Sequence, residues 1–357
     1  MQYGAFEPLL FWSDTVEFLK LLSETPGVPG REERVREVIA REIEGLFDET
    51  RVDAMGNLVC IKRATRAAGK GPAQKVMLAA HMDQIGFYVK HIDDKGFVRV
   101  HNVGGFDPRN LLANRVLVQG KKDLIGVMNP AGKPVHLATE EDRRKQYQIP
   151  DFFVDLGLPA KKVKELVSVG DPVTLVREFS AIGDYACGQA MDNRAAVWVL
   201  VRAMQRLKRS SYDIYAVFTV QEEVGLRGAG PATFGCEPDI AIALDTCLAC
   251  DTPGIPEDQA VTQAGKGVGI KVMDGASISD RSLVDSFVSV AKKEKITYQL
   301  ELMPVGGTDA GAMQRSRSGY KTITISVPTR YIHTVTEMVH RDDLHAARDL
   351  VAAWLAQ

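Results

Sequence analysis

Several apolar runs of strand length in this sequence end in carboxylate or histidine residues, and this pattern constrains the fold more than any other feature. The clearest run covers residues 216–221, which lead directly into Glu222 and Glu223 and then into a glycine-punctuated loop. Neighbouring side chains point to opposite faces of a strand, so two adjacent glutamates at its end can serve different purposes. Open α/β sheets place their ligand sites at the carboxyl ends of strands. The stretch therefore favours an α/β sheet with a polar site at one edge, and a solvated strand end with two surface acids is the alternative.

Other strand-like runs and a strand–helix junction end in a similar way. The residues concerned are His81, Asp83, Asp192, Asp245 and His333. Histidines and carboxylates together form a mixed nitrogen and oxygen donor set, which suits Zn²⁺, Co²⁺ or Mn²⁺ better than Ca²⁺. Singly, each residue has a plainer role, such as a helix N-cap for Asp192. Several acids buried together without a cation are costly, so the set as a whole predicts a metal site.

The order of the predicted elements indicates two structural units. A chain of 357 residues is long for one compact domain. Residues 86–176 contain short β-type runs separated by turn residues, which is typical of a small all-β module. Strands and helices alternate on both sides of this stretch. We therefore expect a mixed-sheet α/β/α sandwich made from residues 1–85 and 177–357, interrupted by an inserted β-rich domain at 86–176.

The composition is that of an ordinary soluble globular protein. The net charge is only −2, so no basic field favours nucleic acid or an anionic membrane as a partner. The first residues lack the basic region of a signal peptide, and no apolar run approaches the length of about 20 residues that spans a bilayer. A cytoplasmic location is therefore expected. The five cysteines are scattered, which argues against a disulfide framework, and the pair Cys247 and Cys250 is interpreted as small apolar residues.

Six motifs in a fixed order carry a family resemblance. They are HMDQIGF from His81, MDNR from Met191, QEEVGLRG from Gln221, LDT from Leu244 with DTPG from Asp251, GGTDA from Gly306, and RYIH from Arg330. Over essentially the whole chain, the sequence resembles the M42 family of dinuclear metallo-aminopeptidases, which includes the tetrahedral (TET) aminopeptidases. The resemblance implies a zinc-peptidase-like sandwich whose β-rich insert is a small β-barrel or PDZ-like dimerisation domain.

The resemblance also implies a ligand set for two divalent metal ions per subunit, most simply Zn²⁺ with Co²⁺ or Mn²⁺ as alternatives. In the family pattern Asp192 bridges the two ions. His81 and Asp245 complete one site, and Glu223 and His333 complete the other. The family usually has His-Ser-Pro where this chain has HTVT from His333. Because the ligand is retained and the proline is lost, we expect a changed loop geometry or specificity rather than loss of metal.

Further roles follow from the same resemblance. Glu222 matches the general base, and Asp83 matches the acid that accepts the ring N–H of the histidine ligand and fixes its tautomer. Residues Gly307, Thr308 and Asp309, in the GGTDA motif, are candidates for contact with the substrate. The alternative for that segment is a turn followed by a helix N-cap, and both roles are compatible because a capped helix start can line a cleft.

The function implied is an aminopeptidase that removes N-terminal residues from short peptides and self-associates as dimers assembled into a tetrahedral dodecamer. One alternative is a related dinuclear hydrolase, either an N-acyl amino acid deacylase or a polysaccharide-active enzyme. A glycosidase would need two carboxylates flanking the glycosidic bond without metal, so the histidines weigh against it. A non-catalytic scaffold is the third alternative, and the complete set of ligands and base weighs against that.

Overall fold

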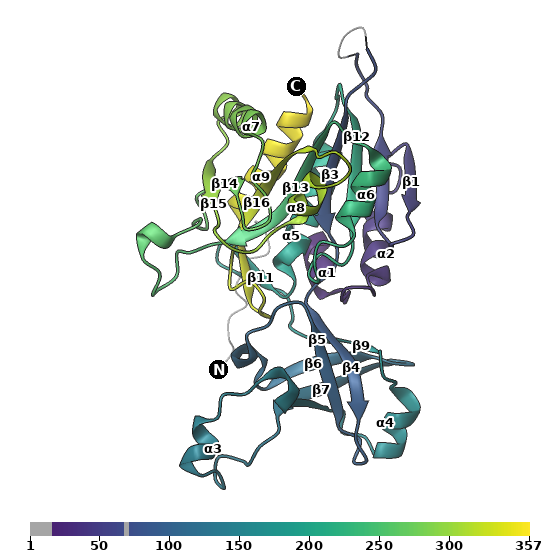
Figure 1. Ribbon diagram of the computed structural model, residues 1–357, viewed down its shortest axis with the longest axis vertical. Coiled ribbons are helices and arrows are strands. Elements are labelled where there is room, and N and C mark those ends of the chain that lie inside the picture. The colour runs from purple at the N-terminus through teal and green to yellow at the C-terminus, as the bar shows by residue number, and fades with distance from the viewer. Residues whose placement is uncertain (1–15, 68–70) are drawn as a thin grey trace, which may run out of the picture.

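The computed structural model describes residues 16–67 and 71–357. Its larger unit is built on a mixed sheet of 11 strands (Figure 1). In sheet order the strands are β1 (Glu49–Val52), β2 (Leu58–Lys62), β12 (Asp213–Thr219), β3 (Lys75–His81), β13 (Ile240–Leu248), β16 (Lys321–Arg330), β17 (Glu337–His340), β11 (Tyr185–Gly188) and β10 (Ser180–Ile182), with β14 (Val268–Met273) beside β16 and β15 (Tyr298–Leu302) beside β14. The expectation about a signal peptide concerns residues 1–15, which lie outside the described part.

Four parallel strands form the centre of this sheet, in the order β12, β3, β13 and β16. They are buried along nearly their whole length. Parallel strands covered on both faces are apolar at every position rather than at alternate ones, which is why these segments appear in the sequence as continuous apolar runs. Their parallel direction brings the carboxyl ends of the strands to the same edge of the sheet.

Helices cover both faces of the sheet. One face carries α1 (Val16–Glu24), α2 (Glu33–Glu42), α5 (Met191–Arg206), α7 (Arg281–Glu294) and α9 (Arg341–Leu355), and the other carries α6 (Ala229–Cys236) and α8 (Asp309–Gln314). Alternate residues of one strand separate between the two cores: Leu78 packs with the first group of helices and Met77 with the second. The predicted α/β/α fold class is therefore confirmed.

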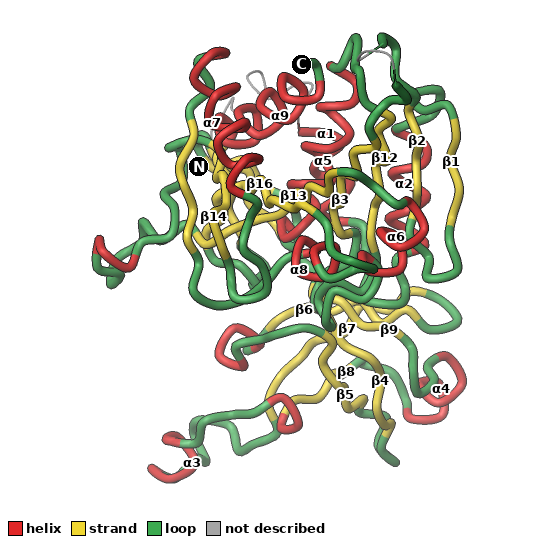
Figure 2. The backbone as a smooth tube through the Cα atoms, turned by 45° about the horizontal axis from the view of Figure 1, so that its top comes forward, coloured by secondary structure: helices red, strands yellow, loops and turns green. Residues whose placement is uncertain are grey.

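The second unit is a closed antiparallel β-barrel that lies below the sheet in Figures 1 and 2. Around the barrel the strands are β4 (Gly86–Ile92), β5 (Val98–Val103), β8 (Phe152–Asp155), β7 (Asp123–Pro130), β6 (Asn114–Gln119) and β9 (Pro172–Leu175). Short helices α3 (Glu140–Arg144) and α4 (Ala160–Leu166) and the 3₁₀ turns η2 (Pro108–Leu111) and η3 (Ile149–Asp151) connect them; a further turn, η4 (Glu257–Gln259), lies in the larger unit. The barrel has its own apolar core, which includes Phe87, Val116 and Val154. The domain limits at 85/86 and 176/177, and a role of the barrel in dimerisation, stay predictions.

The sequence patterns did not predict β8, β10, β11, β17 and α6. The four strands have only three or four residues each, too few for a periodic pattern to stand out. Helix α6 contains two glycines and a proline, which are poor helix formers. Among the described residues, no helix combines the length and apolarity needed to cross a bilayer.

Candidate metal centre

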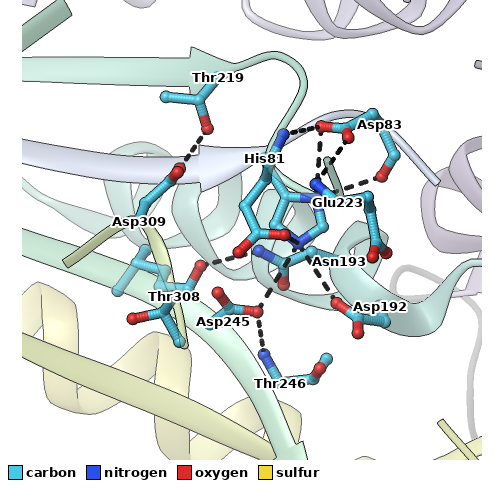
Figure 3. A network of polar contacts seen from close by, with 12 residues as sticks. His81, Asp83, Asp192, Asn193, Thr219, Glu223, Asp245, Thr246, Thr308 and Asp309 are labelled. Carbon is cyan, nitrogen blue, oxygen red and sulfur yellow. Dashed lines mark hydrogen bonds and ion pairs between the residues drawn. The ribbon is translucent and has the colours of Figure 1, made fainter. Parts of the chain in front are cut away.

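The histidines and carboxylates singled out in the sequence come together at the carboxyl edge of the sheet. Figure 3 shows His81, Asp83, Asp192, Glu223 and Asp245 in this cluster. His81 ends β3, Asp245 lies in β13, and Asp192 lies in the first turn of α5. Glu223 follows β12 and His333 lies in the loop between β16 and β17. Residues separated by up to 252 positions in the chain are therefore brought to one site by the parallel order of the strands.

One group of possible ligands consists of His81, Asp192 and Asp245, whose donor atoms all lie within 4.8 Å of one another. Nε2 of His81 is 3.3 Å from Oδ1 of Asp192 and 3.8 Å from Oδ1 of Asp245. In Figure 3, His81 lies between Asp83 on one side and these two carboxylates on the other. Three donors at these separations can converge on a single cation.

A second group consists of Asp192, Glu223 and His333. Nε2 of His333 is 3.6 Å from Oδ2 of Asp192 and 3.4 Å from Oε2 of Glu223. Asp192 thus presents Oδ1 to the first group and Oδ2 to the second. It is the member that the two groups share, which is the arrangement expected of a bridging carboxylate.

The hydrogen bonding of two of the proposed ligand carboxylates is consistent with a cation bound between them. Oε1 of Glu223 is buried and accepts no hydrogen bond from the described part of the chain, and the buried Oδ1 of Asp192 has the 3.3 Å contact with His81 but no well-directed hydrogen bond there. Buried acceptors without partners cost free energy, and a divalent cation would remove that cost. The donor set, two imidazoles with three carboxylates, is one that Zn²⁺, Co²⁺ and Mn²⁺ accept.

The pKa values show how strongly negative the cluster is. Burial opposes the charged form of His333, but its contacts with Asp192 and Glu223 raise its pKa to about 11. Burial likewise opposes the charged form of His81, and surrounding carboxylates, Glu222 first among them, raise its pKa well above the ordinary value. Metals bind neutral imidazole and ionised carboxylate, so a divalent cation would take the place of these protons.

Glu222 lies beside the two groups and belongs to neither. Its Oε2 is 3.8 Å from Nε2 of His81. Burial, together with the charges of Asp245 and Glu223, raises its pKa well above the usual value for a glutamate. A carboxylate with a raised pKa that adjoins the ligands without being one of them is placed to accept and return a proton.

Asp83 uses its carboxylate in a way that the sequence did not predict. Oδ1 accepts the backbone N–H of Glu222 (3.0 Å) and Oδ2 accepts that of Glu223 (3.1 Å). Nδ1 of His81 is 3.2 Å from the backbone oxygen of Asp83 and 3.6 Å from its Oδ1. The hydrogen-bond partner of the His81 ring is therefore the backbone oxygen of Asp83, whereas the Asp83 carboxylate fixes the backbone of the two glutamates. The predicted role of that carboxylate in fixing the His81 tautomer stays a prediction.

Glu337 was not predicted from the sequence. It is buried in β17, and its Oε1 accepts the backbone N–H of His333 (2.7 Å) while Oε2 accepts that of Asp192 (3.0 Å). One side chain thus holds the backbones of two proposed ligands. The only signal in the sequence is an acid four positions after His333, which is too common a pattern to interpret alone.

The loop that carries His333 is held from both structural units. The Thr334 hydroxyl accepts the backbone N–H of Thr336 (3.1 Å), a local constraint at the position where the family pattern has serine followed by proline. Val335 packs into the core of the barrel. A Cβ atom at Gly105, in the loop that follows β5, would lie 3.5 Å from Nδ1 of His333. The barrel therefore helps to place one side of the site.

Only part of the segment Gly306–Asp309 lies at the cavity, and the helix-capping role considered for it is not seen. Gly307 lines the cavity at the site. Thr308 and Asp309 are buried and are not among the described residues that line this cavity. Asp309 accepts a hydrogen bond from the hydroxyl of Thr219, as Figure 3 shows. Thr308 precedes α8, but its side chain makes no capping hydrogen bond.

Histidines and carboxylates that converge at the carboxyl edge of an α/β/α sheet could hold divalent metal, an arrangement typical of metal-dependent hydrolases. The chain belongs to the M42 family, described as M42 glutamyl aminopeptidase, which it matches over residues 56–350. It is thus a hydrolase that acts on peptides.

Individual relatives agree with this assignment. The lysyl aminopeptidase of Pyrococcus furiosus is 32% identical over 353 residues, which cover 96% of both chains. Aminopeptidase APDkam598 of Desulfurococcus kamchatkensis has a similar structure, with a TM-score of 0.90 and 34% identity over 96% of this chain and 94% of that one. The TET1 peptidase of Pyrococcus horikoshii, which can assemble into a tetrahedron or a large octahedral shell, has a TM-score of 0.83 and 33% identity over 95% and 98% of the two chains.

Proposed function

We propose that this protein is a dinuclear metallo-aminopeptidase that removes N-terminal residues from short peptides. The observation that carries the proposal is that Asp192 is shared by two groups of donor atoms. Asp192, His81 and Asp245 would hold one divalent ion, and Asp192, Glu223 and His333 would hold the other. Zn²⁺ is the simplest choice, with Co²⁺ or Mn²⁺ as alternatives of similar ligand preference.

When bound, a pair of divalent ions polarises the scissile carbonyl and lowers the pKa of a water molecule. The side chains of this protein supply the rest of the chemistry. Glu222 takes a proton from the attacking water on its carboxylate and delivers it to the leaving amine. Asp83 keeps Glu222 in place by accepting its backbone N–H. The free α-amine of the substrate would be held by one of the ions or by a nearby acid, which would limit cleavage to the N-terminal residue.

The experiment that tests this function compares free and blocked substrates. The metal-loaded protein is assayed on aminoacyl-p-nitroanilides and on the corresponding N-acyl amino acids. Hydrolysis of the free-amine compounds is expected. Activity on the blocked compounds alone would replace the proposal with an N-acyl amino acid deacylase, and cleavage of a polysaccharide alone would indicate the other hydrolase.

We further propose that the protein works in the cytoplasm as an oligomer, with the barrel forming a dimer contact and dimers assembling into a tetrahedral dodecamer. The support comes from the P. horikoshii relative, which can assemble into a tetrahedron. Light scattering at working concentration should give a mass near twelve times 39.1 kDa. A 39.1 kDa species alone would contradict this part of the proposal.

A further inference from the structure

A cavity of about 510 Å³ opens beside the proposed metal ligands. This volume lies within the range of roughly 300–1,000 Å³ that is usual for small-molecule sites. Its polar end is formed by the proposed ligands together with Glu222. The remaining lining is largely apolar and includes Leu226, Leu248, Met303, Val305 and Ile332. None of the described residues that line the cavity is a lysine or an arginine.

The apolar wall comes from several loops that meet closely. A Cβ atom at Gly307 would lie 2.6 Å from Cβ of Ala276, and one at Gly306 would lie 3.0 Å from Cε of Met303. At Gly307 the loop before α8 therefore approaches the loop after β14 too closely for a side chain to fit, and at Gly306 the positive φ of 77° favours glycine. The result is a continuous surface, with Met303 buried in it and Val305 exposed beside it.

Two charged residues near this apolar wall form an ion pair with each other. Lys271 and Glu301 lie on β14 and β15, the strands that lead into these loops. Both are fully buried, and Nζ of Lys271 is 2.5 Å from Oε1 of Glu301. Neither is among the lining residues. Among the described residues that line the cavity, charged side chains lie at the polar end alone, so the apolar part has none of them to pair with a charged substrate side chain.

We infer that this cavity receives the side chain of the substrate's N-terminal residue and that it selects uncharged apolar residues such as leucine or methionine. The inference rests on the proposed aminopeptidase function and adds the substrate class to it. It differs from the acidic preference in the family's description and from the lysine preference in the name of the P. furiosus relative. With the α-amine at the carboxylate end, an apolar side chain loses contact with water along the wall. A lysine or glutamate side chain would be desolvated there without a partner.

The first test is a panel of aminoacyl-p-nitroanilides on the metal-loaded wild-type protein. The kcat/KM for leucine or methionine should exceed that for lysine or glutamate by about tenfold or more. Equal or better turnover of lysine or glutamate would overturn the inference while leaving the aminopeptidase function intact. Absence of turnover on every free-amine substrate would instead count against the proposed function.

A binding measurement keeps the inference testable in that last case. Calorimetry with metal-loaded Glu222→Gln protein compares Leu-Gly, Lys-Gly and Glu-Gly. Tighter binding of Leu-Gly supports the apolar cavity whether or not the wild-type protein turns over. Tighter binding of a charged dipeptide, or no binding of any of them, overturns the inference.

A matched pair of variants locates the preference in this wall. Val305 and Leu302 are 65% and 57% exposed, so both positions tolerate a charge, but only Val305 lines the cavity. Val305→Glu should lower the leucine-to-lysine ratio of kcat/KM severalfold, because it places a carboxylate within reach of a substrate ammonium group. Leu302→Glu should leave the ratio unchanged. The same ratio in both variants would contradict the assignment of this wall.

Discussion

Glu337 holds the backbone of Asp192, 145 residues earlier in the chain, through a hydrogen bond of 3.0 Å from the Asp192 N–H to Oε2. The other oxygen of the same carboxylate accepts the backbone N–H of His333 at 2.7 Å. Burial, reinforced by the charge of Asp192, raises the pKa of Glu337 to about 8. The buried carboxylate of Glu337 therefore links the loop that carries His333 to the start of α5, which carries Asp192.

Glu337→Gln should weaken metal retention. A glutamine keeps one acceptor oxygen and replaces the other with an NH₂ group, so one of the two backbone N–H groups loses its partner. Removing a partner that orients metal ligands typically costs about 10–100-fold in affinity. Competition with a chelator of known affinity measures the effect, and Glu257→Gln, at an exposed position, is the control. Equal metal affinity in the two variants would remove Glu337 from the support of the site.

Asp192→Asn and Asp245→Asn should differ in metal stoichiometry. Asp192 is common to both donor groups, whereas Asp245 belongs to one. The first variant should therefore lose affinity for both ions, and the second should lose affinity for one. Elemental analysis after dialysis against a metal buffer counts the ions. Retention of one tightly bound ion by Asp192→Asn would show that Asp192 does not bridge.

Asp83→Asn should lower kcat while the protein remains folded. The asparagine can accept only one of the backbone N–H groups of Glu222 and Glu223, so the proposed base becomes less well fixed. We expect a loss of about tenfold or more in kcat, which is typical of residues that orient others at a metal site. Asp94→Asn, at an exposed position of the barrel, is the control. Unchanged kcat in Asp83→Asn would contradict this positioning role.

The ion pair between Asp251 and Arg330 predicts a pH dependence of stability. Nε and a terminal nitrogen of Arg330 donate hydrogen bonds to the two carboxylate oxygens of Asp251 at 2.8 and 2.6 Å. The hydrogen bonds from Arg330 lower the pKa of Asp251 below its ordinary 3.8. A lowered pKa in the folded state stabilises the protein above about pH 4, and this contribution disappears as the pH falls further.

Asp251→Asn should therefore destabilise the protein by about 1 kcal/mol at pH 7, the upper end for a partly exposed pair. The difference from wild type should shrink as the pH is lowered from 5 to 3. Urea denaturation of both proteins at pH 5 and pH 3 measures this difference in the free energy of unfolding. A difference that stays constant over this range would show that the charge of Asp251 does not contribute.

Sequence patterns indicated which residues lie together where strand geometry decides, and they missed contacts where loops decide; that these residues bind metal stays a prediction. His81, Asp192, Asp245 and the two adjacent glutamates stand at or near the ends of buried elements, and parallel strands bring such ends together. The roles of Glu337 and of the Asp83 carboxylate depend on contacts with backbone groups about 140 residues away. No local pattern specifies such contacts.

The same distinction applies to Thr308 and the fold as a whole. The side chain of Thr308 faces the protein interior, where its hydroxyl oxygen is 2.9 Å from that of Thr324. The direction of a loop side chain is not encoded in a periodic pattern. The apolar run 216–221 that leads to Glu222 overlaps β12, so a long buried strand was found from its composition. The short strand β8, which belongs to the barrel, and the short strand β17, which carries Glu337, were missed. Each has four residues, which form no detectable period.

The most direct test of the account is the metal content and kcat of Glu222→Gln, measured on the same preparation. Glutamine preserves the shape of the side chain but cannot take up the proton, and Glu222 belongs to neither donor group. The account predicts two divalent ions per chain, as in the wild-type protein, and a kcat on aminoacyl-p-nitroanilides lowered by about 10²–10⁴-fold. A kcat equal to that of the wild-type protein would contradict the central claim.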